Sequence, residues 1–301
     1  MSTFVNRIAL ALLRPVQRLP LKFHYFWGDV FAWVCRRVAH YREEVVTVNL
    51  ARSFPQCKYK ELNQIKKDFY THLGEVFAET LWLGGCRRNP GKMYRQHLFD
   101  IDGAEGLTDA LRERSVMVLN SHFGNWELMG PFLQGVCDRP GAGCTEKDVV
   151  VVYRRLASRF GEDFFRANRC AVQSEAFDGY VESASVLRHA IEHRNEKKIY
   201  VFPTDQHPYK MARDRHELEF LHQRTSVMMG AAALASRLGM AVWYMGADRE
   251  ERGRYRVHFS KLCDDASTLS QEELMTAFFK RLEEDIVRRP ANYLWSHKRW
   301  K

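Results

Sequence analysis

Short apolar runs that alternate with helical patterns constrain the fold of this chain more than any other feature of its sequence. Five runs have the composition of buried strands, at residues 116–119, 149–153, 199–202, 241–245 and 255–259. Apolar residues at helical spacing lie between most of them, near 126–133, 183–191 and 230–238. Strands and helices that alternate in this way form a mostly parallel central sheet flanked by helices. The expected fold class is therefore α/β.

The chain is expected to hold one α/β domain over residues 41–301, preceded by a helical segment at 1–40. Its 301 residues exceed the usual domain length, but no shift in composition marks a linker. Longer helices are predicted at 60–83 and 272–288 from the spacing of their apolar residues. With 46% apolar residues, the chain can fill a substantial core.

The charge balance favours an anionic partner. Lys and Arg number 46 against 37 Asp and Glu, a formal net charge of +9. Zinc-finger spacing, a Gly-rich phosphate loop and an aromatic RNA-binding signature are all missing from the sequence, so nucleic acid is not expected as a partner. The seven cysteines never occur as Cys-x-x-Cys, which indicates neither a disulfide framework nor a metal site. We expect no cofactor and no metal.

The first forty residues are predicted to associate with a membrane surface without crossing it. Ile8, Leu12 and Val16 follow helical spacing, but arginines interrupt the run before it reaches the ~20 apolar residues of a span. An aromatic segment at 23–33 follows and is flanked by cations, a combination that favours the headgroup region of a bilayer. The alternative is that these helices only cover one face of the core.

His122 and Glu127 are the strongest catalytic candidates. They follow the run at 116–119, with turn-forming residues between them, and Asn125 is expected to cap a helix that begins at Trp126. An imidazole that donates one ring N–H to a carboxylate keeps its other nitrogen free to accept a proton from an alcohol. This pair suits acyl transfer to a hydroxyl, and the alternative is a structural salt bridge in a loop. A spacing of five does not put both side chains on one helical face, which disfavours metal binding.

Polar residues also follow two other predicted strands. Arg154 comes directly after 149–153, and Asp205 and Gln206 come shortly after 199–202. Since open α/β sheets bind ligands beyond the carboxyl ends of their strands, these side chains are expected near His122. Arg154 would hold an anionic substrate group or the oxyanion, unless it is only a solvated cation. Asp205 would position an arginine or a hydroxyl, unless it is only a turn or cap residue.

With these segments in place, the chain resembles the bacterial lipid A late acyltransferases, which transfer lauroyl or myristoyl groups and belong to the lysophospholipid acyltransferase superfamily. The resemblance covers nearly the whole chain. It is carried by the segments Asn120-Ser121-His122-Phe123-Gly124-Asn125-Trp126-Glu127, Val152-Tyr153-Arg154, Asp205-Gln206, Asn49-Leu50-Ala51-Arg52-Ser53-Phe54-Pro55 and Trp295-Ser296-His297-Lys298-Arg299-Trp300.

The resemblance implies a glycerol-3-phosphate acyltransferase-like fold at the cytoplasmic face of the bacterial inner membrane. The donor would be a fatty acyl thioester, usually on acyl carrier protein, and the acceptor a hydroxyl of a glucosamine-based lipid A precursor. His122 and Glu127 are the expected catalytic residues. The residues expected to bind substrate are Arg154, Asp205, Asn125 and Gln206.

In the expected mechanism, Glu127 orients His122, which removes the proton of the acceptor hydroxyl as its oxygen attacks the thioester carbonyl. No acyl-enzyme is needed. Main-chain amides near Gly124 are candidate oxyanion donors. Two alternatives stay open at this point: a lysophospholipid or aminolipid as acceptor, and a non-catalytic protein that binds anionic lipid or an acylated carrier.

Overall fold

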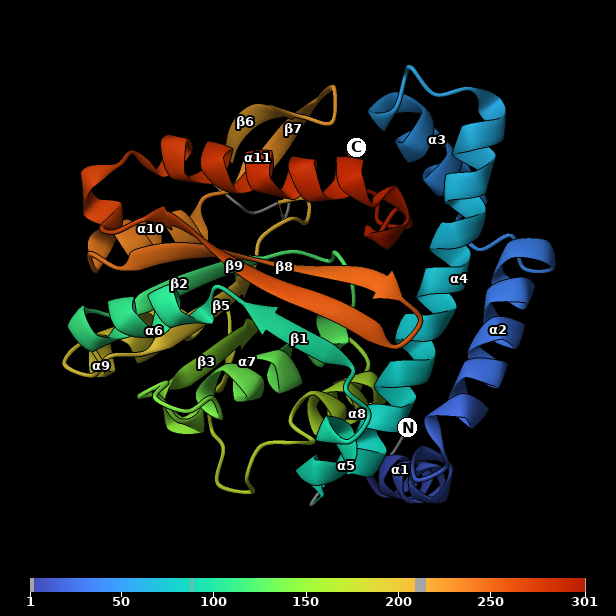
Figure 1. The fold of residues 1–301 in the computed structure, drawn as a ribbon, viewed down its shortest axis with the longest axis horizontal. Helices are drawn as coiled ribbons and strands as arrows, with labels where there is room; N and C mark the ends of the chain where they lie inside the picture. Colours follow the sequence, from blue (N-terminus) through green and yellow to red (C-terminus); the bar gives the residue numbers. More distant parts are fainter. Residues whose placement is uncertain (1–2, 88, 209–214, 301) are drawn as a thin grey trace.

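A central sheet organises the protein, and β2 (Val116–Asn120) lies in its middle (Figure 1). The computed structural model describes residues 3–87, 89–208 and 215–300. Within these ranges the sheet has seven strands in the order β1-β9-β8-β2-β5-β3-β4. The remaining strands of this sheet are β1 (Phe99–Asp102), β3 (Val149–Tyr153), β4 (Tyr180–Glu182), β5 (Ile199–Pro203), β8 (Ala241–Glu251) and β9 (Arg254–Cys263). A separate antiparallel pair is formed by β6 (Arg215–Phe220) and β7 (Gln223–Met228).

The central sheet is mostly parallel, as predicted. β2 pairs in parallel with β5 and β8, and β3 pairs in parallel with β4 and β5. The exception is the β8–β9 hairpin, which is antiparallel and brings β9 beside β1. Each of the five predicted apolar runs lies within one of these strands.

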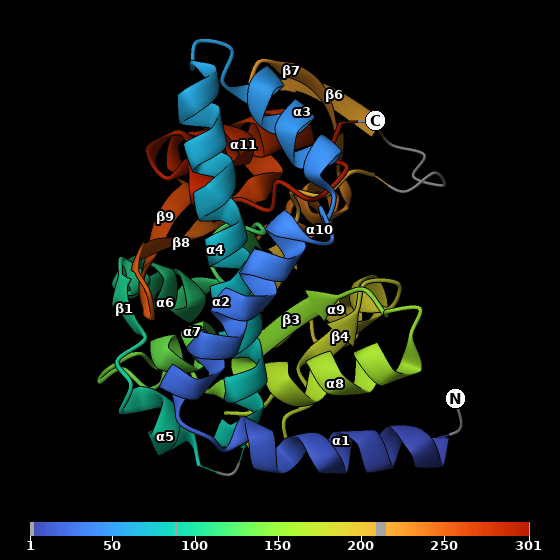
Figure 2. The same cartoon turned by 90° about the vertical axis from the view of Figure 1, so that its right-hand side faces the viewer.

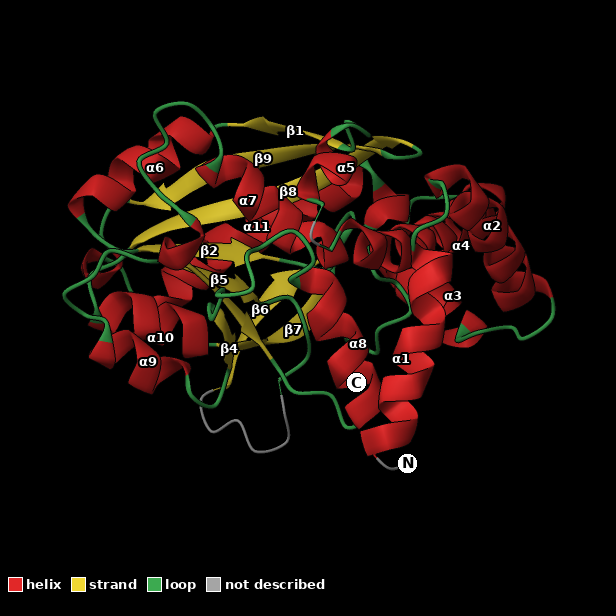
Figure 3. Ribbon diagram, turned by 90° about the horizontal axis from the view of Figure 1, so that it is seen from below, coloured by secondary structure: helices red, strands yellow, loops and turns green. Residues whose placement is uncertain are grey.

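Helices cover both faces of the sheet, as Figure 3 shows. Alternate residues of β2 point to opposite sides: Met117 and Leu119 join one core cluster, and Val116 and Val118 join the other. The first cluster lies under α9 (Val186–Glu192), α10 (Gly230–Arg237) and α11 (Gln271–Arg288), and the second under α6 (Ala104–Glu113) and α7 (Met129–Cys137). The predicted α/β layers are therefore confirmed.

The long helix α4 (Tyr59–Leu83) stands at one end of the sheet and carries α2 (Leu21–Arg37) on its outer side (Figure 2). The two helices approach closely where Gly28 faces Gly74, and a Cβ on Gly28 would lie only 2.5 Å from the Gly74 carbonyl oxygen. The helices around them are α1 (Thr3–Gln17), α3 (Glu43–Ser53), α5 (Pro90–Tyr94) and α8 (Arg159–Arg169). Within residues 3–87, 89–208 and 215–300, the helices lack the combination of length and apolar composition that a membrane span needs.

The outer face of α2 is strongly apolar. Phe26, Trp27 and Trp33 are each more than half exposed, while Leu21 and Ala32 on the opposite face are buried. On α1, Leu12 is 71% exposed. The predicted helical segment therefore has an inner face that packs on α4 and an outer face with exposed aromatic rings.

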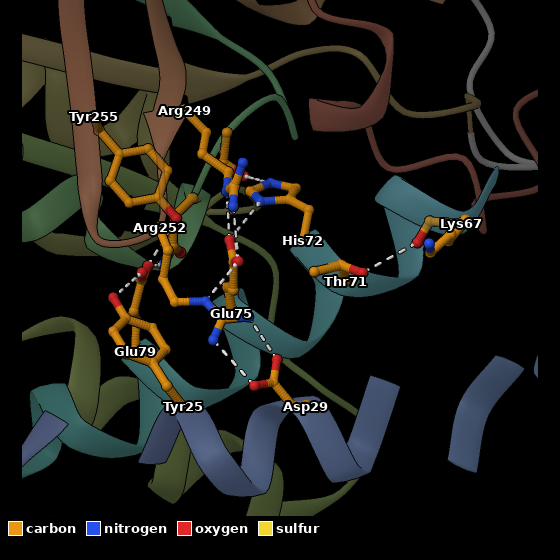
Figure 4. Close-up of polar contacts among 12 residues, drawn as sticks. Tyr25, Asp29, Lys67, Thr71, His72, Glu75, Glu79, Arg249, Arg252 and Tyr255 are labelled. Atoms are coloured by element: carbon orange, nitrogen blue, oxygen red, sulfur yellow. Dashed lines mark hydrogen bonds and ion pairs between the residues drawn. The ribbon is translucent and has the colours of Figure 1, made fainter. Parts of the chain in front are cut away.

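Charged side chains fasten α2 and the β8–β9 hairpin to α4 (Figure 4). Glu75 on α4 is 2% exposed and accepts hydrogen bonds from Arg249 and, at 3.0 Å, from Arg252 Nε. Arg252 also binds both carboxylate oxygens of Asp29 on α2. Removing Glu75 would leave Arg249 and Arg252 without this carboxylate partner, so the junction of the three elements depends on Glu75.

Acidification is expected to weaken this junction. Burial opposes ionisation of Glu75, but its contacts with His72 and Arg249 outweigh burial and hold its pKa at about 2. A carboxylate with a lowered pKa adds stability above its unfolded pKa, and that stability is lost as the pH falls through the folded pKa. Between pH 4.5 and pH 2 the loss should reach about 3 kcal/mol.

Urea unfolding at a series of pH values measures this loss. The free energy of unfolding of the wild type should fall more steeply below pH 4.5 than that of Glu75→Gln, which has no carboxylate to protonate. Glu44→Gln, at an exposed position on α3, should follow the wild type. If the wild-type and Glu75→Gln curves run parallel, Glu75 is not the group that titrates.

Candidate active site

A tight turn after β2 carries the predicted base. Gly124 has φ +71°, and a Cβ there would meet the carbonyl oxygen of Ala247, so both the backbone conformation and the space require glycine. Asn125 then accepts a hydrogen bond from the Glu127 backbone N–H at 3.0 Å and caps the short helix η2 (Trp126–Leu128). The predicted capping role of Asn125 is confirmed, and the turn fixes His122 at the carboxyl end of β2.

The His122 side chain contacts the two polar residues that follow β5. Its Nδ1 lies 2.8 Å from Asp205 Oδ1, and its backbone N–H donates to Asp205 Oδ2 at 3.1 Å. The Gln206 side-chain amide lies 3.1 Å from His122 Nε2. With Nδ1–H donating to Asp205, Nε2 is the nitrogen that accepts, first from Gln206 and then from a reacting hydroxyl.

Asp205 is a buried carboxylate, 2% exposed. Burial opposes its ionisation, but the charge and hydrogen bonds of His122 prevail and hold the pKa of Asp205 below its usual range. Burial, followed by the charge of Asp205, raises the pKa of the neighbouring Tyr293 well above 10, so the tyrosine keeps its proton. Asp205 therefore stays an anion that orients the imidazole and stabilises its protonated form.

The carboxylate that holds His122 is thus Asp205, and the predicted pairing of His122 with Glu127 is wrong. Glu127 lies in η2 and turns toward α8, where Arg169 binds both of its oxygens, at 2.7 and 2.8 Å. A bidentate guanidinium contact satisfies this carboxylate strongly. The third Arg169 nitrogen, Nη1, donates to the Tyr180 hydroxyl at 2.6 Å.

His122 opens onto a cavity of about 980 Å³. The imidazole is 16% exposed, and its ring centroid lies 5.3 Å from that of Trp126, another lining residue. Side chains from α7, β3 and α10 give the cavity a largely apolar wall, among them Met129, Leu133, Val149, Val151, Ala231 and Leu234. A volume of this size lies near the upper end of the range for small-molecule sites.

The other predicted residues divide between the cavity and the structure beneath it. Arg154 and Gln206 line the cavity, as does Arg169. Asn125 does not reach it: its side chain is fully buried, and its amide nitrogen donates to Glu79 at 2.6 Å. Its expected contact with substrate is therefore wrong, since both polar atoms of the side chain are already bonded. The Gly124 amide is also occupied, because it donates to the Asn292 carbonyl.

Two parts of the site were not predicted from the sequence. Arg169 lies 42 positions after Glu127, and nothing in its local pattern indicates that contact. The C-terminal segment supports the turn from outside, since Leu294 N–H donates to the His122 carbonyl at 3.1 Å and Phe123 pairs with Tyr293. The sequence offered two signals for this segment, its aromatic and basic composition and the share of residues 295–300 in the family resemblance, and neither indicated these contacts.

This arrangement suits a general base. A neutral imidazole accepts the proton of a hydroxyl at Nε2, and a buried carboxylate on Nδ1 stabilises the resulting cation. The apolar cavity beside the imidazole has room for a hydrocarbon chain, and Arg154 supplies a positive charge at its lining.

A family model matches the whole chain, and relatives and a solved structure are similar to it. The family described as "Bacterial lipid A biosynthesis acyltransferase" matches residues 1–301. The chain is 23% identical over 291 residues to the lipid A biosynthesis palmitoleoyltransferase of Escherichia coli K12, covering 94% of this chain and 87% of the relative. The lipid A biosynthesis acyltransferase of Shigella flexneri gives the same identity and coverage. The crystal structure of a 1-acyl-sn-glycerophosphate acyltransferase from Thermotoga maritima aligns with a TM-score of 0.37 and 12% identity, covering 89% of this chain and 96% of that one.

Proposed function

The chain belongs to the bacterial lipid A biosynthesis acyltransferase family, and we propose that it transfers a fatty acyl group from an acyl thioester to a hydroxyl of a lipid A precursor. The observation that carries this proposal is the His122–Asp205 pair beside a cavity of about 980 Å³. A base held by a buried carboxylate activates a hydroxyl, and a largely apolar cavity accommodates the chain that is transferred.

In the proposed reaction, His122 Nε2 takes the proton of the acceptor hydroxyl as its oxygen attacks the thioester carbonyl. The tetrahedral intermediate then collapses, the carbon–sulfur bond breaks, and the thiol leaves with the proton that the imidazole returns. Gln206 moves off Nε2 when the hydroxyl arrives, and Arg154 attracts an anionic group of the substrate or the developing oxyanion. Glu127, neutralised by Arg169, supports the wall of the site.

The donor in this proposal is an acyl group on acyl carrier protein. A net charge of +9 favours an acidic partner, and the same charge favours an anionic membrane surface. We place the protein at the cytoplasmic face of the inner membrane, attached by its helical segment at residues 1–40.

Product analysis with a panel of substrates tests the proposed function. The purified protein is incubated with a fatty acyl thioester of either acyl carrier protein or coenzyme A. Each reaction also contains one acceptor: a glucosamine-based lipid A precursor, a lysophospholipid or an aminolipid. Mass spectrometry should find the acyl group on the lipid A precursor. Acylation of only the lysophospholipid or the aminolipid would contradict the proposed acceptor, and binding without any product would indicate a non-catalytic protein.

Membrane attachment through the outer face of α2 gives a separate prediction. Phe26→Ser, Trp27→Ser and Trp33→Ser together remove three exposed rings without touching the buried face that packs on α4. Sedimentation with vesicles of anionic phospholipid should show at least a tenfold weaker association than for the wild type. Tyr59→Ser, at a position that is 80% exposed on α4, is the matched control and should bind as the wild type does. Equal binding by the triple variant would refute attachment through α2.

A further inference from the structure

A buried carboxylate in α4 lies behind the turn that carries His122. Glu79 is fully buried and accepts hydrogen bonds from the Tyr25 hydroxyl at 2.7 Å and the Tyr255 hydroxyl at 2.8 Å (Figure 4). It also accepts a hydrogen bond from the Asn125 amide at 2.6 Å. Burial raises the pKa of Glu79 against the effect of these bonds. A polar cluster of this kind is costly to bury unless each member is satisfied, so its geometry is strongly specified.

Asn125 transmits this geometry to the reacting group. It is bonded on both sides, to Glu79 through its amide nitrogen and to the Glu127 backbone N–H through its oxygen. It lies three residues after His122 in the same turn. The two hydrogen bonds of Asn125 therefore help to set the backbone path of the turn that places the imidazole.

A second bond from α4 holds the same turn. His72 Nε2 donates to the Gly124 carbonyl at 3.0 Å, and His72 is 3% exposed. Gly124 is the residue with positive φ, so its carbonyl direction fixes the path of the turn. α4 thus contacts two consecutive residues of the turn with two polar side chains that lie on one face of the helix.

The cluster also reaches the helix with the apolar outer face. Tyr25 belongs to α2, and its ring lies 5.3 Å from the Arg252 guanidinium. Gly28, which allows α2 and α4 to approach closely, lies near this point. The inner face of α2 is therefore in contact with the carboxylate that holds the turn, while its outer face carries the exposed aromatic rings.

We propose that Glu79 is a positioning residue for the reaction, because it holds the His122 turn through Asn125. Through the Tyr25 hydrogen bond to Glu79, this positioning also depends on how α2 packs against α4. The proposal rests on the proposed function, because it assumes that His122 acts on substrate. Misplacement of a reacting group by about 1 Å costs on the order of 10²-fold in rate, so loss of the Asn125 contact should lower kcat and leave KM largely unchanged.

An exchange of donor and acceptor tests the contact. Asn125→Asp alone places a second carboxylate against Glu79 and should lower kcat by about 10²-fold, with KM within about twofold of the wild type. Adding Glu79→Gln returns an amide donor to the pair, now on residue 79. The kcat of this double variant should be at least tenfold higher than that of Asn125→Asp. A purely structural role predicts changes in thermal stability without this recovery of kcat. A double variant that folds but is no faster than Asn125→Asp overturns the proposal.

A gentler variant keeps the test decisive if Asn125→Asp does not fold. Asn125→Ser retains an oxygen that caps the Glu127 N–H but is too short to reach Glu79, so kcat should fall at unchanged KM. A folded Asn125→Ser with wild-type kcat refutes positioning through Asn125. Tyr25→Phe should lower kcat by a few-fold, and wild-type kcat in that variant refutes the part assigned to α2.

Matched controls distinguish the kcat changes expected at Asn125, Glu79 and Tyr25 from changes that any substitution in these helices would cause. Asn63→Asp lies at an exposed position of α4, and Tyr59→Phe at another, and both should keep wild-type kcat and KM. His122→Asn is measured in the same assay. If it keeps full turnover, the proposed function fails; if it is inactive while the exchange shows no recovery, only the positioning proposal fails.

Discussion

His122→Asn should lower kcat by about 10² to 10⁴-fold, the contribution of a well-placed general base. Asparagine has no group that accepts a proton at neutral pH, yet its amide donates a hydrogen bond and so stays compatible with the buried Asp205. The imidazole is 16% exposed at the edge of the cavity, so the substitution leaves no large void in the core. The measurement is the steady-state rate of thiol release with a saturating lipid acceptor.

The matched control is His97→Asn. His97 is exposed and has φ +49°, a conformation that asparagine tolerates, so this variant should keep wild-type kcat. The thermal unfolding midpoint of both variants should stay within a few degrees of the wild type. A folded His122→Asn with more than a tenth of wild-type kcat would contradict the assignment of His122 as the base.

The second large effect is expected from Asp205→Asn. An amide at this position no longer favours Nδ1–H over Nε2–H and no longer stabilises the imidazolium that forms during the reaction, so kcat should fall by about 10² to 10⁴-fold. Glu127→Gln should act differently, because Glu127 binds Arg169 and not the imidazole. We expect that variant to lose about 2 kcal/mol of stability and less than tenfold in kcat.

The comparison of these two variants decides which acid serves the base. Both kcat and the urea unfolding free energy are measured for each, with Asp163→Asn, at an exposed position of α8, as the control. A larger loss of kcat in Glu127→Gln than in Asp205→Asn would reverse the assignment and support the pair expected from the sequence.

The strands of the sheet could be predicted from the sequence, because strands that are buried on both faces occur as short apolar runs. β2, β3 and β5 were each predicted, and so was the meeting of their polar ends at one edge. The order of the strands was not predictable in the same way. Since β5 pairs directly with β2, the carboxylate after β5 reaches His122 from a position 83 residues away in the chain.

Glu127 was wrongly predicted as the partner of His122 because the local backbone geometry cannot be read from the sequence. Glu127 is five residues from His122, but the chain turns at Gly124 and enters η2, which points the Glu127 side chain toward Arg169 on α8. The buried role of Asn125 escaped prediction for a similar reason, because its partner Glu79 lies on a helix 46 residues earlier. Both contacts depend on how helices pack around the sheet, and neither helix carries a local pattern for them.

The central claim is that a hydroxyl of the lipid acceptor attacks the thioester directly, with His122 as its base. The most direct test is a time course in which free thiol and lipid ester are both measured. The wild-type protein is given acyl thioester in two parallel reactions, one with the lipid A precursor and one without it. We predict equal amounts of thiol and ester when the acceptor is present, and neither above background when it is omitted. Acyl groups that accumulate on the protein, or thiol release without ester, would contradict the account.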